Sequence, residues 1–158
     1  MTTRTMIVQW PGASGRWYAH TVFPWDVLPD VENANFILVE ARGKTALPLF
    51  IGVSEALTRE LPLRPEWSAA QMHGLTHVHV HLLAADARER ETIRSDIAAC
   101  VETPLNGEAR SAGAGAELIQ VTPGGPVRWL GGRQPSHRAT QLGLKFILPQ
   151  AAAVRRAG

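Results

Sequence analysis

Residues 76–83 constrain the fold more than any other segment of the chain, because polar and apolar side chains alternate along them. Alternation places the polar residues on one face of a β-strand and the apolar residues on the other. The polar residues include three histidines, His77, His79 and His81. Over residues 86–101 the apolar period becomes helical, with Ile93 and Ile97 on one stripe. A strand that leads into an amphipathic helix predicts an α/β fold.

Four earlier segments are rich in β-branched and apolar residues and predict strands: residues 5–10, 16–23, 36–39 and 47–51. Pro48 cannot donate a hydrogen bond within a sheet, so the last of these strands is expected to start late or to lie at an edge. We expect Gly52 to end that strand. Two helices should follow: one begins at the N-cap Ser54 and is stopped by Pro62, and one spans residues 67–73 and is closed by Gly74.

The 158 residues correspond to about one domain, and a composition with 45% hydrophobic and 19% charged residues is that of a globular protein. No apolar run reaches the roughly 18 residues of a membrane-spanning helix. The apolar stretch near the N-terminus is too short for a signal peptide, so we expect a cytoplasmic protein without a membrane partner. The single cysteine, Cys100, excludes an intrachain disulfide.

Charge is unevenly distributed along the chain. Residues 1–108 contain 9 Lys or Arg and 13 Asp or Glu, a net charge of −4, whereas residues 109–158 contain 7 basic residues and one acid, a net charge of +6. A basic extension is typical of a protein that binds nucleic acid, and equally of a solvated surface. The candidate nucleic-acid-binding residues are Arg64 in the body and Arg110, Arg128, Arg133, Arg138 and Lys145 in the extension.

An ordered series of short motifs crosses the middle of the chain. It consists of Phe50-Ile51-Gly52, then Ser54, Leu57 and Leu61, then residues 74–81, Asp96-Ile97, and finally Pro104-Leu105-Asn106. This series resembles the GIY-YIG nuclease superfamily, in its small bacterial and phage branch. Phe50-Ile51-Gly52 stands for the second signature of that superfamily, Tyr-Ile-Gly, and Ala34-Asn35-Phe36 stands for the first, Gly-Ile-Tyr.

The resemblance implies a small three-stranded antiparallel sheet flanked by helices over residues 31–108. Residues 1–30 then form an N-terminal strand extension, and residues 109–158 form a basic C-terminal extension. The resemblance also implies metal-dependent hydrolysis of a phosphodiester, with Mg²⁺ or Mn²⁺ as the cofactor of an active member. In that chemistry a tyrosine helps to activate water, an arginine stabilises the developing phosphate charge, a glutamate holds the metal, and an asparagine braces the site.

Most of these catalytic positions are substituted here. Phe36 and Phe50 stand at the tyrosine positions, Glu60 at the arginine position with Arg59 beside it, Arg94 at the metal-binding glutamate position, and Asn106 at the asparagine position. A phenyl ring has no hydroxyl to carry a proton, and a guanidinium has no lone pair for a metal. The reciprocal change of charge predicts that Glu60 and Arg94 face one cleft as an ion pair, unless they are two unrelated surface changes.

We therefore expect a degenerate nuclease-like domain that binds nucleic acid or a protein partner without efficient cleavage. One alternative is an active metal-dependent endonuclease with relocated residues, in which Arg59 or Arg64 supplies the arginine and a histidine of residues 77–81 the base or metal ligand. Another alternative is a structural or assembly protein that keeps the fold for its shape. The histidine strand also fits the histidine-triad pattern of nucleotide hydrolases, in which a histidine is the nucleophile.

The three histidines of this strand are also candidate ligands of a transition metal. Histidines at positions i and i+2 can converge on Zn²⁺, Ni²⁺ or Fe²⁺ from one strand, with Asp86 or Glu89 as a further ligand. The alternative is a half-exposed strand face whose histidines hydrogen-bond to neighbouring groups or to water.

Overall fold

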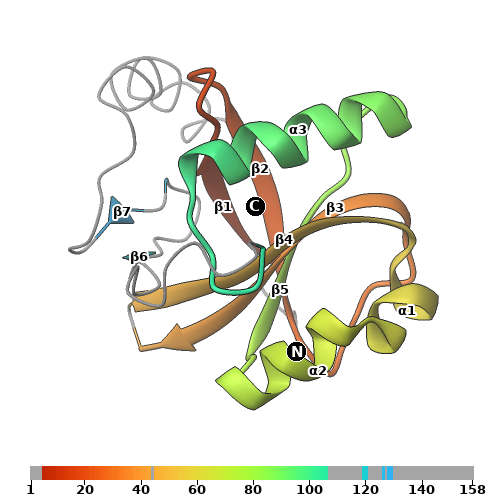
Figure 1. Ribbon diagram of the computed structural model, residues 1–158, viewed down its shortest axis with the longest axis vertical. Helices are drawn as coiled ribbons and strands as arrows, with labels where there is room; N and C mark the ends of the chain where they lie inside the picture. Colours follow the sequence, from red (N-terminus) through yellow and green to blue (C-terminus); the bar gives the residue numbers. More distant parts are fainter. Residues whose placement is uncertain (1–4, 44, 107–118, 121–125, 127, 130–158) are drawn as a thin grey trace.

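The computed structural model describes residues 5–43, 45–106, 119–120, 126 and 128–129, and shows a sheet with helices on both faces (Figure 1). The strands are β1 (Met6–Pro11), β2 (Trp17–Pro24), β3 (Glu32–Arg42), β4 (Thr45–Ala56), β5 (His77–His81) and the two-residue strands β6 (Ile119–Gln120) and β7 (Arg128–Trp129). The helices are α1 (Leu57–Glu60), the 3₁₀ helix η1 (Leu61–Leu63), α2 (Pro65–His73) and α3 (Ala87–Cys100).

The strand order across the sheet is β1-β2-β5-β3-β4-β6-β7, and every neighbouring pair is antiparallel. β5 enters between two hairpins, so it pairs with β2 on one side and with β3 on the other. The α/β class is therefore confirmed. The expected three-stranded sheet is not, because β1 and β2 pair onto β5 and give a sheet with five longer strands.

The two faces of the sheet carry separate hydrophobic cores. α3 covers the first, which contains Val8, Trp10, Tyr18, Ile37, Val39, Ala46, Ile51, Ile93, Ile97 and Val101. α1, η1 and α2 cover the second, which contains Ala34, Phe36, Leu38, Leu47, Leu49, Leu57, Leu61, Trp67, Ala70, Leu75, Val78 and Val80. Figure 1 shows α3 on one side of the sheet and α1 and α2 on the other. Alternate residues of β3 point to opposite faces, which explains its continuous apolar run: both faces are buried.

β4 is longer than the sequence predicts. It passes through Pro48, where the register with β3 shifts, and a bulge of this kind tolerates the missing proline N–H. The strand continues beyond Gly52 and Ser54 to Ala56, so neither the predicted strand end nor the predicted N-cap is correct. Ser54 instead lies opposite Ala34 in the ladder, and the backbone turns into α1 only after Ala56.

The predicted end of α2 at Gly74 is confirmed, and α3 lies within the helical period predicted for residues 86–101. Gly74 ends α2 with a φ of 108°, in the left-handed region that favours glycine. Asp86 caps α3, since its Oδ1 accepts a hydrogen bond from Glu89 N at 2.8 Å. The predicted stripe of Ile93 and Ile97 is buried against the sheet.

Most of the basic extension lies outside the described residues. The candidate residues not described are Arg110, Arg133, Arg138 and Lys145, whereas Arg128 falls in β7. In the part of the chain that the structure describes, no helix has both the length and the apolar character needed to cross a membrane.

Candidate functional site

Two phenylalanine rings lie together at the positions where the resemblance places tyrosines. Phe36 on β3 is fully buried and Phe50 on β4 is half-buried, with ring centroids 5.9 Å apart. Gly52 lies opposite Phe36 in the β3–β4 register. A Cβ at Gly52 would be 2.7 Å from Phe36 Cζ and from Phe50 Cε1, so the two rings occupy the space of a side chain there. These three residues form one packed unit that carries no hydroxyl.

Arg64 lies against this unit from the segment between η1 and α2. Its Nη2 donates to Val53 O at 2.7 Å and to Glu60 Oε2 at 3.3 Å. Its guanidinium carbon is 5.6 Å from the centroid of the Phe36 ring, within the range of a cation–π contact. The Arg64 side chain remains 30% exposed, so part of it is accessible from the surface. We call Phe36, Phe50, Glu60 and Arg64 the Phe–Arg cluster.

The carboxylate of Glu60 is already occupied by donors. Its Oε2 accepts hydrogen bonds from Ser54 Oγ at 2.7 Å and from Glu55 N at 3.2 Å, in addition to the bond from Arg64. These bonds, that from Ser54 first, lower the pKa of Glu60 below its ordinary value. A carboxylate with a lowered pKa and three donors is a weak general base.

The structure separates Glu60 from Arg94, so the predicted ion pair between them is wrong. Glu60 ends α1 on one face of the sheet, whereas Arg94 belongs to α3 on the other (Figure 1). Each charge finds a partner one helical turn away on its own segment: Glu60 pairs with Arg64, and Arg94 Nε donates to Glu91 Oε1 at 2.8 Å. Arg59 is exposed on α1, beside Glu60.

The residues at the implied metal position do not fit a divalent cation. Arg94 offers no lone pair, and its pKa is raised further by the hydrogen bonds to Glu91. Among the described residues, no group of three His, Cys, Asp or Glu side chains is placed to hold a metal ion.

Asn106 braces the outer side of β4. Its Oδ1 accepts from Ile51 N at 2.5 Å and its Nδ2 donates to Ile51 O at 2.7 Å, so one side chain pairs both backbone groups of Ile51. Thr103 Oγ1 donates to the same Oδ1, and Leu105 N donates to Leu49 O at 3.1 Å. Among the described residues, β6 pairs with β4 only at Thr45 and Ala46. Residues 103–106 supply hydrogen bonds to the β4 backbone beyond that point.

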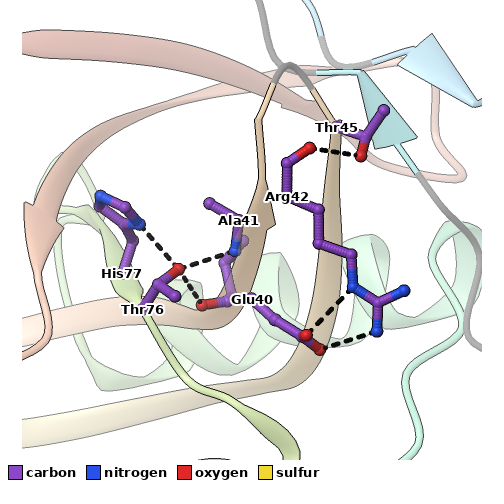
Figure 2. Close-up of polar contacts among 7 residues, drawn as sticks. Glu40, Ala41, Arg42, Thr45, Thr76 and His77 are labelled. Carbon is purple, nitrogen blue, oxygen red and sulfur yellow. Dashed lines mark hydrogen bonds and ion pairs between the residues drawn. The ribbon is translucent and has the colours of Figure 1, made fainter.

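The three predicted histidines hydrogen-bond to three different partners. His77 Nδ1 meets Thr76 Oγ1 at 2.8 Å, and Figure 2 shows the same hydroxyl oxygen contacting the β3 backbone. His79 Nδ1 accepts from Trp10 Nε1 at 3.0 Å, and His81 Nδ1 donates to Ala19 O at 2.7 Å. The structure therefore does not bring these three rings together around one ion.

The burial of these histidines affects both their charge at pH 7 and their access to a substrate. His79 and His81 are only 2% and 4% exposed, so they are not the half-exposed face that was the alternative prediction. Burial lowers the pKa of all three, that of His79 to about 3, which keeps the rings neutral at pH 7. A nucleophilic histidine must reach its substrate, so the buried His79 and His81 do not favour the histidine-triad alternative.

A fourth histidine, His20, was not assigned a role from the sequence. It is fully buried on β2, and its ring centroid lies 5.3 Å from that of His81. Its position on the same face as Tyr18 follows from the alternation of β2, but its neighbour on β5 becomes evident only when the two strands are paired.

Comparisons of this chain with protein-family models, with curated proteins and with solved structures found no match. The Phe–Arg cluster offers an arginine to an anion, while its rings carry no proton and its carboxylate is engaged. This arrangement is suited to binding a phosphate rather than to activating water.

Proposed function

We propose that this chain is a nuclease-like domain that binds nucleic acid through the phosphate backbone without cleaving it efficiently. The observation that carries the proposal is Arg64, a partly exposed arginine over the Phe36 ring, in a cluster whose one carboxylate, that of Glu60, is engaged by three donors. Arginine is the side chain best suited to a phosphate, because its planar fork of donors matches the phosphate oxygens.

The arrangement of the central elements supports the GIY-YIG-like part of this proposal. β5, β3 and β4 are adjacent antiparallel strands with β3 in the middle, and helices cover both of their faces. A three-stranded antiparallel sheet flanked by helices is what the resemblance implies for residues 31–108. On this view β1 and β2 are an addition at the β5 edge.

Three substitutions argue against efficient cleavage. The rings of Phe36 and Phe50 have no hydroxyl to relay a proton, and Arg94 replaces the carboxylate that would hold a metal. The alternative of relocated catalysis needs a histidine base or ligand near Arg64. β5 instead directs His79 and His81 to the α3 face, whereas the Phe–Arg cluster is on the α1 face.

The charge distribution of the chain supports nucleic acid as the partner. Residues 109–158 carry a net charge of +6, on a body whose net charge is −4. Contacts between basic side chains and phosphates release counterions, so the affinity of such a complex falls steeply with salt. We propose that the extension supplies much of the affinity and that Arg64 adds a contact fixed by the fold.

A binding titration tests this assignment of Arg64. Fluorescence anisotropy of labelled DNA and RNA duplexes, at several salt concentrations, gives the slope of log K against log salt. We expect salt-sensitive binding, and we expect Arg64→Ala to weaken it and to reduce that slope by about 1. Arg42→Ala is the matched control, because Arg42 pairs with Glu40 at the far end of β3 (Figure 2).

Two outcomes would contradict the proposal. One is binding that does not respond to salt, or no binding to either nucleic acid, which would turn the search to a protein partner. The other is an Arg64→Ala variant, folded by circular dichroism, that binds as tightly as the Arg42→Ala control.

A further inference from the structure

A row of buried polar side chains crosses the sheet beneath α3, outside the Phe–Arg cluster. His81 on β5 pairs directly with Asn35 on β3. On the other side of β5, the ladder with β2 begins at Thr21 and Val80, so His20 is the β2 neighbour of His81. His20, His81 and Asn35 are 0%, 4% and 2% exposed.

Both histidine rings are fixed through Nδ1 and leave Nε2 without a hydrogen-bond partner in the part of the chain that the structure describes. His20 Nδ1 donates to Tyr18 O at 2.8 Å, and His81 Nδ1 donates to Ala19 O at 2.7 Å. A carbonyl oxygen can only accept, so Nδ1 carries the proton and Nε2 of each neutral ring holds a lone pair. His20 Nε2 is buried, and neither Nε2 atom makes a hydrogen bond to a described residue.

Asn35 adds a third unpartnered acceptor to the row. Its Nδ2 donates to Arg90 O on α3 at 2.8 Å, which orients the amide and leaves Oδ1 without a hydrogen-bond partner among the described residues. Buried polar atoms are nearly always paired, so the two buried acceptors His20 Nε2 and Asn35 Oδ1, on either side of His81, indicate a missing donor or cation.

The geometry favours a cation bound by the two imidazoles. Histidines that bind metals usually donate their other ring N–H to a backbone carbonyl or a carboxylate, as both rings do here. The ring centroids are 5.3 Å apart. With metal–nitrogen bonds of about 2.1 Å, two imidazoles on one tetrahedral ion have centroids roughly 5 Å apart.

We propose that His20 Nε2 and His81 Nε2 bind one transition-metal ion of the Zn²⁺, Co²⁺ or Ni²⁺ class, with Asn35 Oδ1 as a third ligand. Imidazole nitrogen is a preferred ligand of these ions. An amide oxygen is the third ligand, so the proposed site does not need three His, Cys, Asp or Glu side chains, and among the described residues no three of these are placed to hold a metal ion. The ion joins β2, β5 and β3 beneath α3 and has a structural role, independent of nucleic-acid binding.

Two charged residues of α3 lie near the row, Glu89 and the buried Arg90, whose carbonyl oxygen accepts from Asn35. Glu89, in the first turn of α3, is the charged side chain that acts electrostatically on His81. Its Oε2 accepts from Ala85 N at 2.6 Å. Burial keeps the pKa of both His20 and His81 below the ordinary value, so neither ring needs to lose a proton at pH 7 to bind a metal.

A cobalt titration of the full chain tests the site. Co²⁺ is added to the folded protein and, because α3 covers the row, also during refolding from urea. We expect one Co²⁺ per chain with visible absorption bands, displaced by Zn²⁺. His20→Gln and His81→Gln should each weaken binding at least tenfold, since even the loss of an outer-shell partner has that effect. His77→Gln is the matched control, because His77 is engaged by Thr76 (Figure 2).

Thermal unfolding gives a second readout. Zn²⁺ should raise the unfolding midpoint of the wild type and of His77→Gln, but not that of His81→Gln, which decides the case if His20→Gln does not fold. The proposal is overturned if the wild type binds no stoichiometric Co²⁺, or if folded His81→Gln binds it as tightly as His77→Gln does. A bound water would then be the simplest partner of the orphaned acceptors.

Discussion

At Gly52, the lack of a side chain is what allows Phe36 and Phe50 to meet. The resemblance identified this glycine as part of a signature, while its role as a strand end was predicted from local sequence and is wrong. The requirement for glycine comes from the two rings packed above it, which belong to different strands. A contact between strands is not contained in the local pattern from which a strand end is predicted.

Gly52→Ala should destabilise the protein by about 1–3 kcal/mol, the usual cost of forcing an extra methyl group into a packed site. The added Cβ meets both rings at 2.7 Å, so at least one ring must move. Urea unfolding of the variant measures the loss in the free energy of unfolding. The double variant Gly52→Ala/Phe50→Leu should recover part of it, and a single variant as stable as the wild type would show that the rings do not constrain this position.

Among the secondary-structure elements, α3 is hydrogen-bonded to the loop between β1 and β2. Asp96 Oδ1 accepts from Ser14 N at 2.8 Å, and Oδ2 accepts from Ser14 Oγ at 2.5 Å and from Tyr18 OH at 2.7 Å. Ala13 N also donates to Asp96 O at 3.0 Å. The predicted loop between the first two strands is confirmed, but its attachment to a helix some eighty residues later depends on a fold that local sequence does not reveal.

Because Tyr18 takes part in this attachment, we expect its pKa to differ between the folded and unfolded states. Tyr18 is the only tyrosine in the chain. Burial, followed by the contacts with Asp96, raises the pKa of Tyr18 to about 12. The folded state therefore keeps the proton after an unfolded tyrosine has lost it, so the free energy of unfolding should fall as the pH rises from about 10 to about 12.

Asp96→Asn removes the carboxylate charge and should lower the pKa of Tyr18, while burial keeps that pKa above 10. Ultraviolet absorbance of tyrosinate follows the titration directly, because no second tyrosine contributes. Asp86→Asn, at the start of the same helix, is the control. Identical titration curves for Asp96→Asn and the control would contradict this account of the contact.

The hydrogen bonds of Asn106 to the outer side of β4 give a second prediction about how the elements are held together. Asn106→Ala leaves both backbone groups of the buried Ile51 without the side chain that pairs them. We expect a loss of about 2–3 kcal/mol, as for two buried hydrogen bonds whose partners are left unsatisfied. Denaturant unfolding measures it, with the exposed Gln71→Ala as a control that should stay within about 0.5 kcal/mol of the wild type. A similar loss in both variants would argue against the bracing role of Asn106.

At the scale of the whole molecule, local period and capping residues were sufficient to predict β5, α2 and α3. They were not sufficient to predict how β1 and β2 join the sheet, because the pairing of β2 with β5 links segments more than fifty residues apart. Long-range pairing that local sequence does not reveal also explains why the candidate site was only partly predicted. Phe36 and Phe50 do meet, and Arg64 contacts both Phe36 and Glu60. Arg94 does not join them, because β5 directs the chain to the opposite face before α3 begins.

The proposed role of the Phe–Arg cluster is to bind phosphate without activating water. Incubation of the protein with supercoiled plasmid and Mg²⁺, Mn²⁺ or EDTA tests it most directly, with denatured and native lanes on one gel. We expect intact plasmid in every denatured lane and a salt-sensitive mobility shift in the native lanes. Metal-dependent nicking that disappears in Arg64→Ala or Arg59→Ala would contradict it, because the chemistry would then have been kept by relocated residues.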